Sequence, residues 1–207
     1  MPHSVFAQPA SPPRIAKITV DQYHSMIKAG ILREGAPIEL LDGLLVYKDR
    51  STRGENPMSI GEPHSVVVEL VHQVGQPLAS FGCHMRTQNP ISLAPHNEPE
   101  PDGAIVRGMQ RDYLRHLPGP GDVYCVFEVA DSSLLYDRTT KLQLYAQFSI
   151  PQYVILNLID MQAEVYEQPM AAERRYAKKT IVKAGETLAL LAGPSGPLKI
   201  PAAQVLP

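Results

Sequence analysis

The segment that most constrains the fold of this chain is residues 122–130, which is nearly continuously apolar. It reads Asp-Val-Tyr-Cys-Val-Phe-Glu-Val-Ala and contains one glutamate, Glu128. Such a run is typical of a central strand that is covered on both faces. A second apolar run follows at 152–159, after a stretch at 137–148 whose apolar residues recur at helical spacing. The sequence therefore predicts a central strand–helix–strand unit and an α/β or α+β fold.

Shorter elements are predicted on both sides of this unit. Thr19 is a plausible N-cap and Gly30 a stop signal, which predicts a helix over 20–29. Asp42-Gly43 between two apolar runs predicts a hairpin with strands at 37–41 and 44–48. Apolar residues three and four apart predict a helix over 63–80, fraying at Pro77, after a loop at 49–62. Further short strands are predicted at 83–87, 91–93, 103–107, 162–167, 176–182, 187–191 and 198–200.

A chain of 207 residues predicts one main domain. We expect a flexible, proline-rich tail at 1–14, a domain over 15–192 and a C-terminal extension over 193–207. No apolar run reaches the roughly 18 residues of a membrane helix, so no membrane association is expected. Two cysteines are too few for a disulfide framework, and a reducing cytoplasm is the expected location.

The charge balance excludes one class of protein. The net charge of −2 excludes the strongly basic nucleic-acid-binding proteins, which carry a large excess of Lys and Arg. A local basic face around an acidic metal site is still compatible with this value, because net charge averages over the whole surface.

Two carboxylates occupy positions that call for an explanation: Glu128 within an apolar strand, where burying a charge costs free energy, and Asp102 directly after a proline. Glu128 interrupts the central apolar run, so it must be paired, bound to a metal, or already in solvent at the end of the strand. Asp102 follows Pro101 and directly precedes a strand; alone, this dipeptide is typical of a turn. Together, two carboxylates at neighbouring strand ends can share a cation such as Mg²⁺.

The helix after the Glu128 strand carries a third candidate. Asp137, Lys141 and Tyr145 are four residues apart and share one helix face. Either Asp137 and Lys141 form a surface ion pair, or Lys141 reaches back over the strand end to a reacting oxygen. Glu39 in the first hairpin and His64 at the start of the second helix have solvent exposure as their simplest interpretation. The chain has no Walker loop, dinucleotide fingerprint, Gly-x-Ser-x-Gly or His-Glu-x-x-His motif.

Taken in order, these pieces resemble a known family. They are Ile38-Glu39-Leu40-Leu41-Asp42-Gly43, His64, Pro101-Asp102, Phe127-Glu128-Val129-Ala130-Asp131-Ser132-Ser133, Asp137 with Lys141 and Tyr145, and Pro151-Gln152-Tyr153-Val154-Ile155. This order resembles the Uma-type restriction endonuclease family, long catalogued as a domain of unknown function, within the PD-(D/E)XK nuclease superfamily. The resemblance spans about residues 17 to 190.

The resemblance implies a restriction-endonuclease-like core, with a mixed central β-sheet flanked by helices and extra β-hairpins. The main domain at 15–192 would then be a nuclease domain. Asp102 and Glu128 would bind Mg²⁺ or Mn²⁺, with the backbone carbonyl of Val129 as a further ligand. The superfamily places its lysine at the position of Ala130, and Lys141 matches a form in which this lysine has moved to the following helix.

For the remaining positions, the resemblance implies less specific roles. Glu39 matches an upstream acid that can hold a second metal or a water, and His64 matches a position to which no role is assigned. Asp137 and Tyr145 would support the site. Arg107 and Arg138 are candidate DNA contacts that could equally be solvated surface.

The activity so implied is a Mg²⁺-dependent DNA endonuclease in which a metal-activated water attacks phosphorus. Cutting both strands would favour a homodimer, since one site cuts one strand. Two alternatives remain open: a catalytically silent nuclease-fold protein that binds nucleic acid or a protein partner, and a nuclease for structured or single-stranded nucleic acid. A shortage of aromatic residues disfavours single strands.

Overall fold

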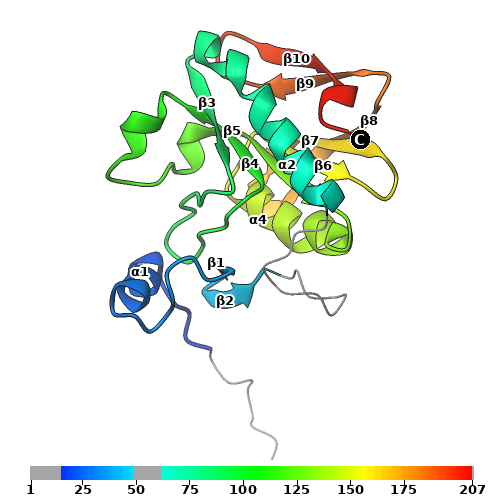
Figure 1. Ribbon diagram of the computed structural model, residues 1–207. Coiled ribbons are helices and arrows are strands. Elements are labelled where there is room, and N and C mark those ends of the chain that lie inside the picture. The colour runs from blue at the N-terminus through cyan, green and yellow to red at the C-terminus, as the bar shows by residue number, and fades with distance from the viewer. Residues whose placement is uncertain (1–14, 49–61, 207) are drawn as a thin grey trace, which may run out of the picture.

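A computed structural model describes residues 15–48 and 62–206 of the chain (Figure 1). The predicted tail at 1–14 and nearly all of the predicted loop at 49–62 lie outside the described residues.

The centre of the molecule is a six-stranded mixed sheet with the strand order β3-β4-β5-β6-β7-β8. Only β5 and β6 run parallel, and the other neighbours are antiparallel. The strands are β3 (Cys83–Thr87), β4 (Gly103–Arg107), β5 (Val123–Ala130), β6 (Gln152–Asn157), β7 (Gln162–Met170) and β8 (Arg175–Lys183). The mixed sheet with helices confirms the predicted fold class.

The predicted strand–helix–strand unit is confirmed as the crossover between the two parallel strands. Strand β5 leads into a helical segment made of α3 (Leu134–Tyr136), a π-helical turn (Asp137–Lys141) and α4 (Leu142–Gln147), and the chain returns as β6. A parallel pair requires a crossover of this kind, because its strands cannot be joined by a tight turn. The π-helical turn lies next to the carboxyl end of β5.

Both faces of the sheet are covered, which explains the unbroken apolar sequence of β5. One face packs against α2 (Glu62–Val74) and the hairpin of β9 (Thr187–Leu191) and β10 (Pro197–Pro201); the other packs against α4 (Figure 1). Residues of β5 alternate between these cores. Phe127 and Val129 belong to the α2 side, and Val126 and Ala130 to the α4 side. Glu128 therefore falls on the α4 side.

The first hairpin forms from the local sequence. Strands β1 (Ile38–Leu41) and β2 (Leu44–Tyr47) pair antiparallel around Asp42 and Gly43, whose φ angles of 50° and 75° suit the tight turn. Helix α1 (Val20–Lys28) begins with a capping box in which Thr19 and Gln22 satisfy each other's backbone N–H groups. The hairpin and α1 lie together beside one end of the sheet (Figure 1).

Two local predictions are wrong. Residues 91–93 form no strand, because Leu93 makes only an isolated bridge to Asn97. The helix predicted over 63–80 ends at Val74, and a 3-10 helix (Gln76–Phe81) with Pro77 in its first turn replaces the rest. Short 3-10 helices also occur at Gln110–Tyr113, Pro120–Asp122, Ala171–Glu173 and Ala202–Gln204. Over residues 15–48 and 62–206, no helix is long and apolar enough to span a membrane.

Candidate functional site

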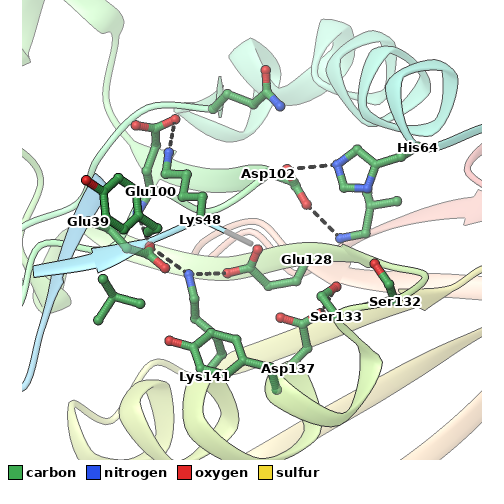
Figure 2. Close-up of a pocket in the computed structure, with 15 residues that line it drawn as sticks. Glu39, Lys48, His64, Glu100, Asp102, Glu128, Ser132, Ser133, Asp137 and Lys141 are labelled. Carbon is green, nitrogen blue, oxygen red and sulfur yellow. Dashed lines mark hydrogen bonds and ion pairs between the residues drawn. The ribbon is translucent and has the colours of Figure 1, made fainter. Parts of the chain in front are cut away.

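A cavity of about 350 Å³ opens where the first hairpin, the ends of β4 and β5, the start of α2 and the π-helical turn meet (Figure 2). Its lining combines charged and hydroxyl side chains with a few apolar ones. The lining residues are Glu39, Val46, Tyr47, Lys48, His64, Gln88, Glu100, Asp102, Glu128, Val129, Ser132, Ser133, Tyr136, Asp137 and Lys141.

Glu128 projects from β5 into this cavity and is 6% exposed. The buried Tyr145 hydroxyl donates a hydrogen bond of 2.7 Å to Glu128 Oε1, and thereby fixes the carboxylate from the side of α4. Burial raises the pKa of Glu128 to about 8, against the opposing attraction of Lys141. The carboxylate is therefore short of positive charge in this setting.

Lys141 extends from the π-helical turn and lies between two carboxylates, as Figure 2 shows. Its Nζ atom is 2.8 Å from Glu39 Oε2 and 3.4 Å from Glu128 Oε1. Burial acts to lower the pKa of Lys141, but the attraction of Glu128 and Glu39 outweighs it and raises the pKa. The lysine is thus a buried, charged ammonium group.

Glu39 joins the site from the first hairpin, far away in the sequence. Its position in β1 follows the pairing of Glu39 with Val46 across the hairpin, and it is 4% exposed. Glu39 Oε2 accepts the Lys141 bond and a hydrogen bond of 3.2 Å from the backbone N–H of Glu100. The hairpin is therefore bonded directly to the π-helical turn and to the segment before Asp102.

Asp102 lies immediately before β4, with its side chain next to the end of β5. The backbone N–H of Val129 donates to Asp102 Oδ2 at 2.9 Å, and His64 Nε2 lies 3.4 Å from Asp102 Oδ1. Burial raises the pKa of Asp102, but His64, the Val129 N–H and Lys141 together outweigh it, so that the net shift is downward. Asp102 is consequently an ionised carboxylate in the cavity.

Asp137 forms the floor of the cavity next to Lys141. The Ser133 hydroxyl donates to Asp137 Oδ2 at 2.7 Å. Burial raises the pKa of Asp137 to about 6, although the Ser133 bond and the charge of Lys141 oppose the shift. Tyr153 donates to the backbone carbonyl of Asp137, which ties the π-helical turn to β6.

The structure thus brings together all of the predicted acids, the lysine and His64 in one cavity. The alternative of an exposed Asp137–Lys141 ion pair is wrong, because both side chains are about 95% buried. Solvent exposure of Glu39 and of Glu128 is equally wrong. Arg107 and Arg138 do not line the cavity: Arg107 pairs with Asp122, and Arg138 pairs with the buried Glu164.

Several lining residues were not identified from the sequence. Lys48 forms an ion pair with Glu100, and both belong to segments that the hairpin brings together. Gln88 follows β3, and Tyr136 precedes the π-helical turn. Glu100 stands two residues before Asp102, so the Glu-Pro-Asp sequence was the one available signal.

The composition of the cavity suits a divalent cation. Five carboxylates line it, from Glu39, Glu100, Asp102, Glu128 and Asp137, against two lysines, Lys48 and Lys141. Carboxylate oxygens are the ligands that Mg²⁺ prefers, with waters completing the octahedron. A group of three or more His, Cys, Asp or Glu side chains poised around one ion is not found in the described part of the chain. A cation here would therefore depend on one or two carboxylates and on water.

A family model and several chains of solved structures match this chain. Residues 20–199 match the Uma2 family, described as "Putative restriction endonuclease". One solved structure, of a "putative nuclease belonging to DUF820" from Anabaena variabilis, matches with a TM-score of 0.60 and 13% sequence identity, over 91% of this chain and 97% of that chain. None of the curated proteins compared with the chain matches it.

Proposed function

Because the chain belongs to the Uma2 family, we propose that it is a Mg²⁺-dependent endonuclease that hydrolyses phosphodiester bonds in DNA. One observation carries this proposal: Lys141 reaches from the crossover helix to Glu128 and Glu39, in a cavity that Asp102 also lines. Two strand-end carboxylates, an upstream acid and a lysine in one cavity are the groups that metal-assisted phosphodiester hydrolysis needs.

The residues that would hold the cation are Asp102 and Glu128, with the backbone carbonyl of Val129 as a further ligand. Glu39, which is bonded to Lys141, would hold a water or a second cation. When bound, the cation would supply a Lewis acid that lowers the pKa of a water and neutralises charge on the phosphate oxygens. Manganese has the same preference for oxygen ligands and would serve in place of magnesium.

The protein groups around these ligands have separate tasks. The Tyr145 hydroxyl and the Val129 N–H hold Glu128 and Asp102 in place. Lys141 supplies a permanent positive charge near the phosphate, because its pKa is raised. His64, which contacts Asp102 and also lines the cavity, orients that carboxylate. Asp137 acts on Lys141 by its charge.

A supercoiled plasmid tests the proposal. We expect nicking by the wild type in Mg²⁺ or Mn²⁺ and none in EDTA. Asp102→Asn and Lys141→Met should each lower the nicking rate by about a thousandfold, since each removes several kcal/mol of charge stabilisation and 1.4 kcal/mol is tenfold.

Two exposed residues of the same types serve as matched controls. Asp21 and Lys28 lie on α1 and do not line the cavity, so Asp21→Asn and Lys28→Met should nick at the wild-type rate. Equal plasmid survival with wild type and with the site variants would sink the nuclease proposal. Linear product and a dimer on gel filtration would support a homodimer that cuts both strands.

A second function is favoured by a different observation. Lys141 is already bonded to Glu39 and lies close to Glu128 within the described structure, and an internal ion network of this kind also suits a nuclease-fold protein that binds nucleic acid or a protein without cutting. Binding of DNA without nicking in any divalent cation would select this function.

A further inference from the structure

One lining residue, Gln88, has no part in the network of acids and lysines. It directly follows β3, where the chain leaves the sheet at the edge of the cavity. The backbone N–H of Gln88 donates to the carbonyl of Asp102 at 3.2 Å. This bond ties the position of Gln88 to the residue that we assign as a cation ligand.

The backbone of Gln88 is held in an unusual conformation. Its φ angle is +49°, in the left-handed region that side chains other than glycine rarely adopt. Of the described non-glycine residues with positive φ, Gln88 is the one that lines the cavity. Strained backbone persists where the surrounding structure enforces it, and it clusters at binding and active sites.

The side-chain amide of Gln88 has an unused donor. Its Nε2 atom is buried and has no hydrogen-bond partner within the described part of the chain. Of the described residues with such an atom, which are His84, Arg86, Gln88 and Glu98, Gln88 is the one in the cavity. Buried donors are nearly always paired, so this amide lacks an acceptor that something else must bring.

The charged donors of the cavity are already committed. Lys48 is bonded to Glu100, and Lys141 is bonded to Glu39 and lies close to Glu128. A phosphate group that enters this cavity meets an excess of carboxylates and needs donors that are not neutralised. The neutral amide of Gln88 offers two N–H bonds and no negative charge.

We infer that the Gln88 amide is a substrate-binding group that donates a hydrogen bond to a non-bridging phosphate oxygen of the nucleic acid next to the cation site. This inference rests on the proposed function of the cavity. The bond fixes the phosphate relative to Asp102, because Gln88 and Asp102 are joined through their backbones.

The test compares variants of the full chain in DNA binding, without requiring cleavage. Gln88→Met keeps the length of the side chain and removes the donor, and Gln88→Glu replaces the donor with a negative charge. Gln110→Met, an exposed glutamine far from the cavity, is the matched control. Binding of a fluorescein-labelled DNA duplex in Ca²⁺ is followed by anisotropy, and thermal unfolding of each variant is recorded.

We expect Gln88→Met to raise the Kd about tenfold and Gln88→Glu about a hundredfold, since a hydrogen bond to a charged group is lost and then replaced by repulsion. Gln110→Met should leave the Kd unchanged. The melting temperature of Gln88→Met should stay at the wild-type value, because the amide nitrogen has no hydrogen-bond partner to lose among residues 15–48 and 62–206.

Failure of the inference differs from failure of the proposed function. A Kd of Gln88→Met equal to the wild-type Kd, or a loss that follows a lowered melting temperature, overturns the role of Gln88 even if the wild type nicks plasmid. DNA binding that weakens in Gln88→Met without any nicking by the wild type supports Gln88 and overturns the nuclease. A wild type that binds no DNA overturns both.

Discussion

At the scale of single residues, the cavity contains more buried carboxylates than lysines. Glu128 and Glu39 share one ammonium group, that of Lys141, while Asp102 is held by His64 and a backbone N–H. The attraction between opposite charges is strong inside a protein, but the free energy needed to remove both ions from water is of similar size. Burial raises the pKa of Glu128, because the attraction of the one shared lysine does not offset the cost of removing the carboxylate from water.

This imbalance predicts a pH dependence of stability in the metal-free protein. The folded pKa of Glu128 is about 8, above its unfolded value, so the folded state binds the proton more tightly. The free energy of unfolding should therefore fall as the pH rises from about 7 to about 8.5. Urea unfolding in EDTA, followed by circular dichroism, measures the change.

The control for this prediction is Glu128→Gln, which should remove most of the slope. His84, whose pKa burial lowers, acts in the opposite direction but below neutral pH. The lowered pKa of Glu164 acts only in acid. A stability that is flat or rises across this range in the wild type would contradict the assignment.

Sequence patterns identified most single residues of the site but not their partners. Asp102, Glu128 and Lys141 stand out because charge beside an apolar strand must be compensated. Lys48 and Glu100 carry no such signal, since each is an ordinary charged residue in a polar stretch. Their proximity comes from the hairpin, which sequence spacing does not encode. Likewise, nothing in the sequence reveals the positive φ of Gln88.

At the scale of elements, the π-helical turn determines what the crossover helix presents to the cavity. Its backbone hydrogen bonds join residues five apart, whereas those of an α-helix join residues four apart. Both Asp137 and Lys141 within the turn are buried. Helical periodicity predicted the helix and could not predict this irregularity, because one added residue leaves the apolar pattern of α4 intact.

Deleting Thr140 tests the role of this turn. Thr140 is exposed, so its removal should leave a continuous α-helix and a folded protein. The residues before the deletion then rotate by about 100° relative to α4, which takes Asp137 out of the cavity. We expect the plasmid-nicking rate to fall about a hundredfold, as for other small misplacements of reacting groups.

A substitution of Thr140 by Ala, which keeps the chain length, is the control and should retain the wild-type rate. Far-UV circular dichroism and the melting temperature check that the deletion variant is folded. Full nicking by a folded deletion variant would show that the π-helical turn is dispensable.

The contact between α2 and the sheet gives a second test at this scale. A Cβ atom at Gly103 would lie 2.8 Å from Val71 Cγ1 and 3.3 Å from Phe127 Cδ2. Gly103→Ala should lower the free energy of unfolding by about 1–3 kcal/mol, because the buried neighbours must shift. Chemical denaturation measures this loss.

Gly121→Ala is the matched control, since no atom lies within 4 Å of its added Cβ and its φ is not positive. It should be neutral or slightly stabilising. Equal effects of the two substitutions would show that α2 is not tightly packed at Gly103. Because Gly103 adjoins Asp102, we also expect weaker cation binding in Gly103→Ala.

At the scale of the whole molecule, about half of the basic side chains in the described part of the chain are paired with acids. The ion-paired basic residues are Lys17, Lys48, Arg107, Arg138, Lys141, Arg175, Lys178 and Lys179. The other eight described basic residues form no ion pair with another described residue, but none of them lines the cavity. The net charge of −2 agrees with this arrangement.

DNA binding should therefore depend weakly on salt. For duplex DNA, the slope of log K against log salt is about −0.9 for each phosphate contact, and we expect a slope no steeper than about −3. Anisotropy titrations in Ca²⁺ at several salt concentrations give the slope. A slope near −8 would show that the unpaired basic residues outside the cavity also contact the DNA backbone.

The overall fold was the part most open to prediction. Continuous apolar runs identify β5 and β6 as central, and an apolar helix between them leaves the parallel crossover as the simplest connection. The segment at 91–93 was mistaken for a strand because short apolar runs also occur where a loop packs into the core. Ile91 and Leu93 are both fully buried without pairing as a strand.

The bond between Glu39 and Lys141 joins residues that are 102 positions apart. A growing polypeptide emerges from the ribosome with its amino end first, so Glu39 leaves the exit tunnel long before Lys141 has been added. The cavity is accordingly assembled late in synthesis. A product truncated before the crossover helix would contain Glu39, Asp102 and Glu128 without their lysine, and the candidate machinery would be incomplete until the central parallel pair had closed.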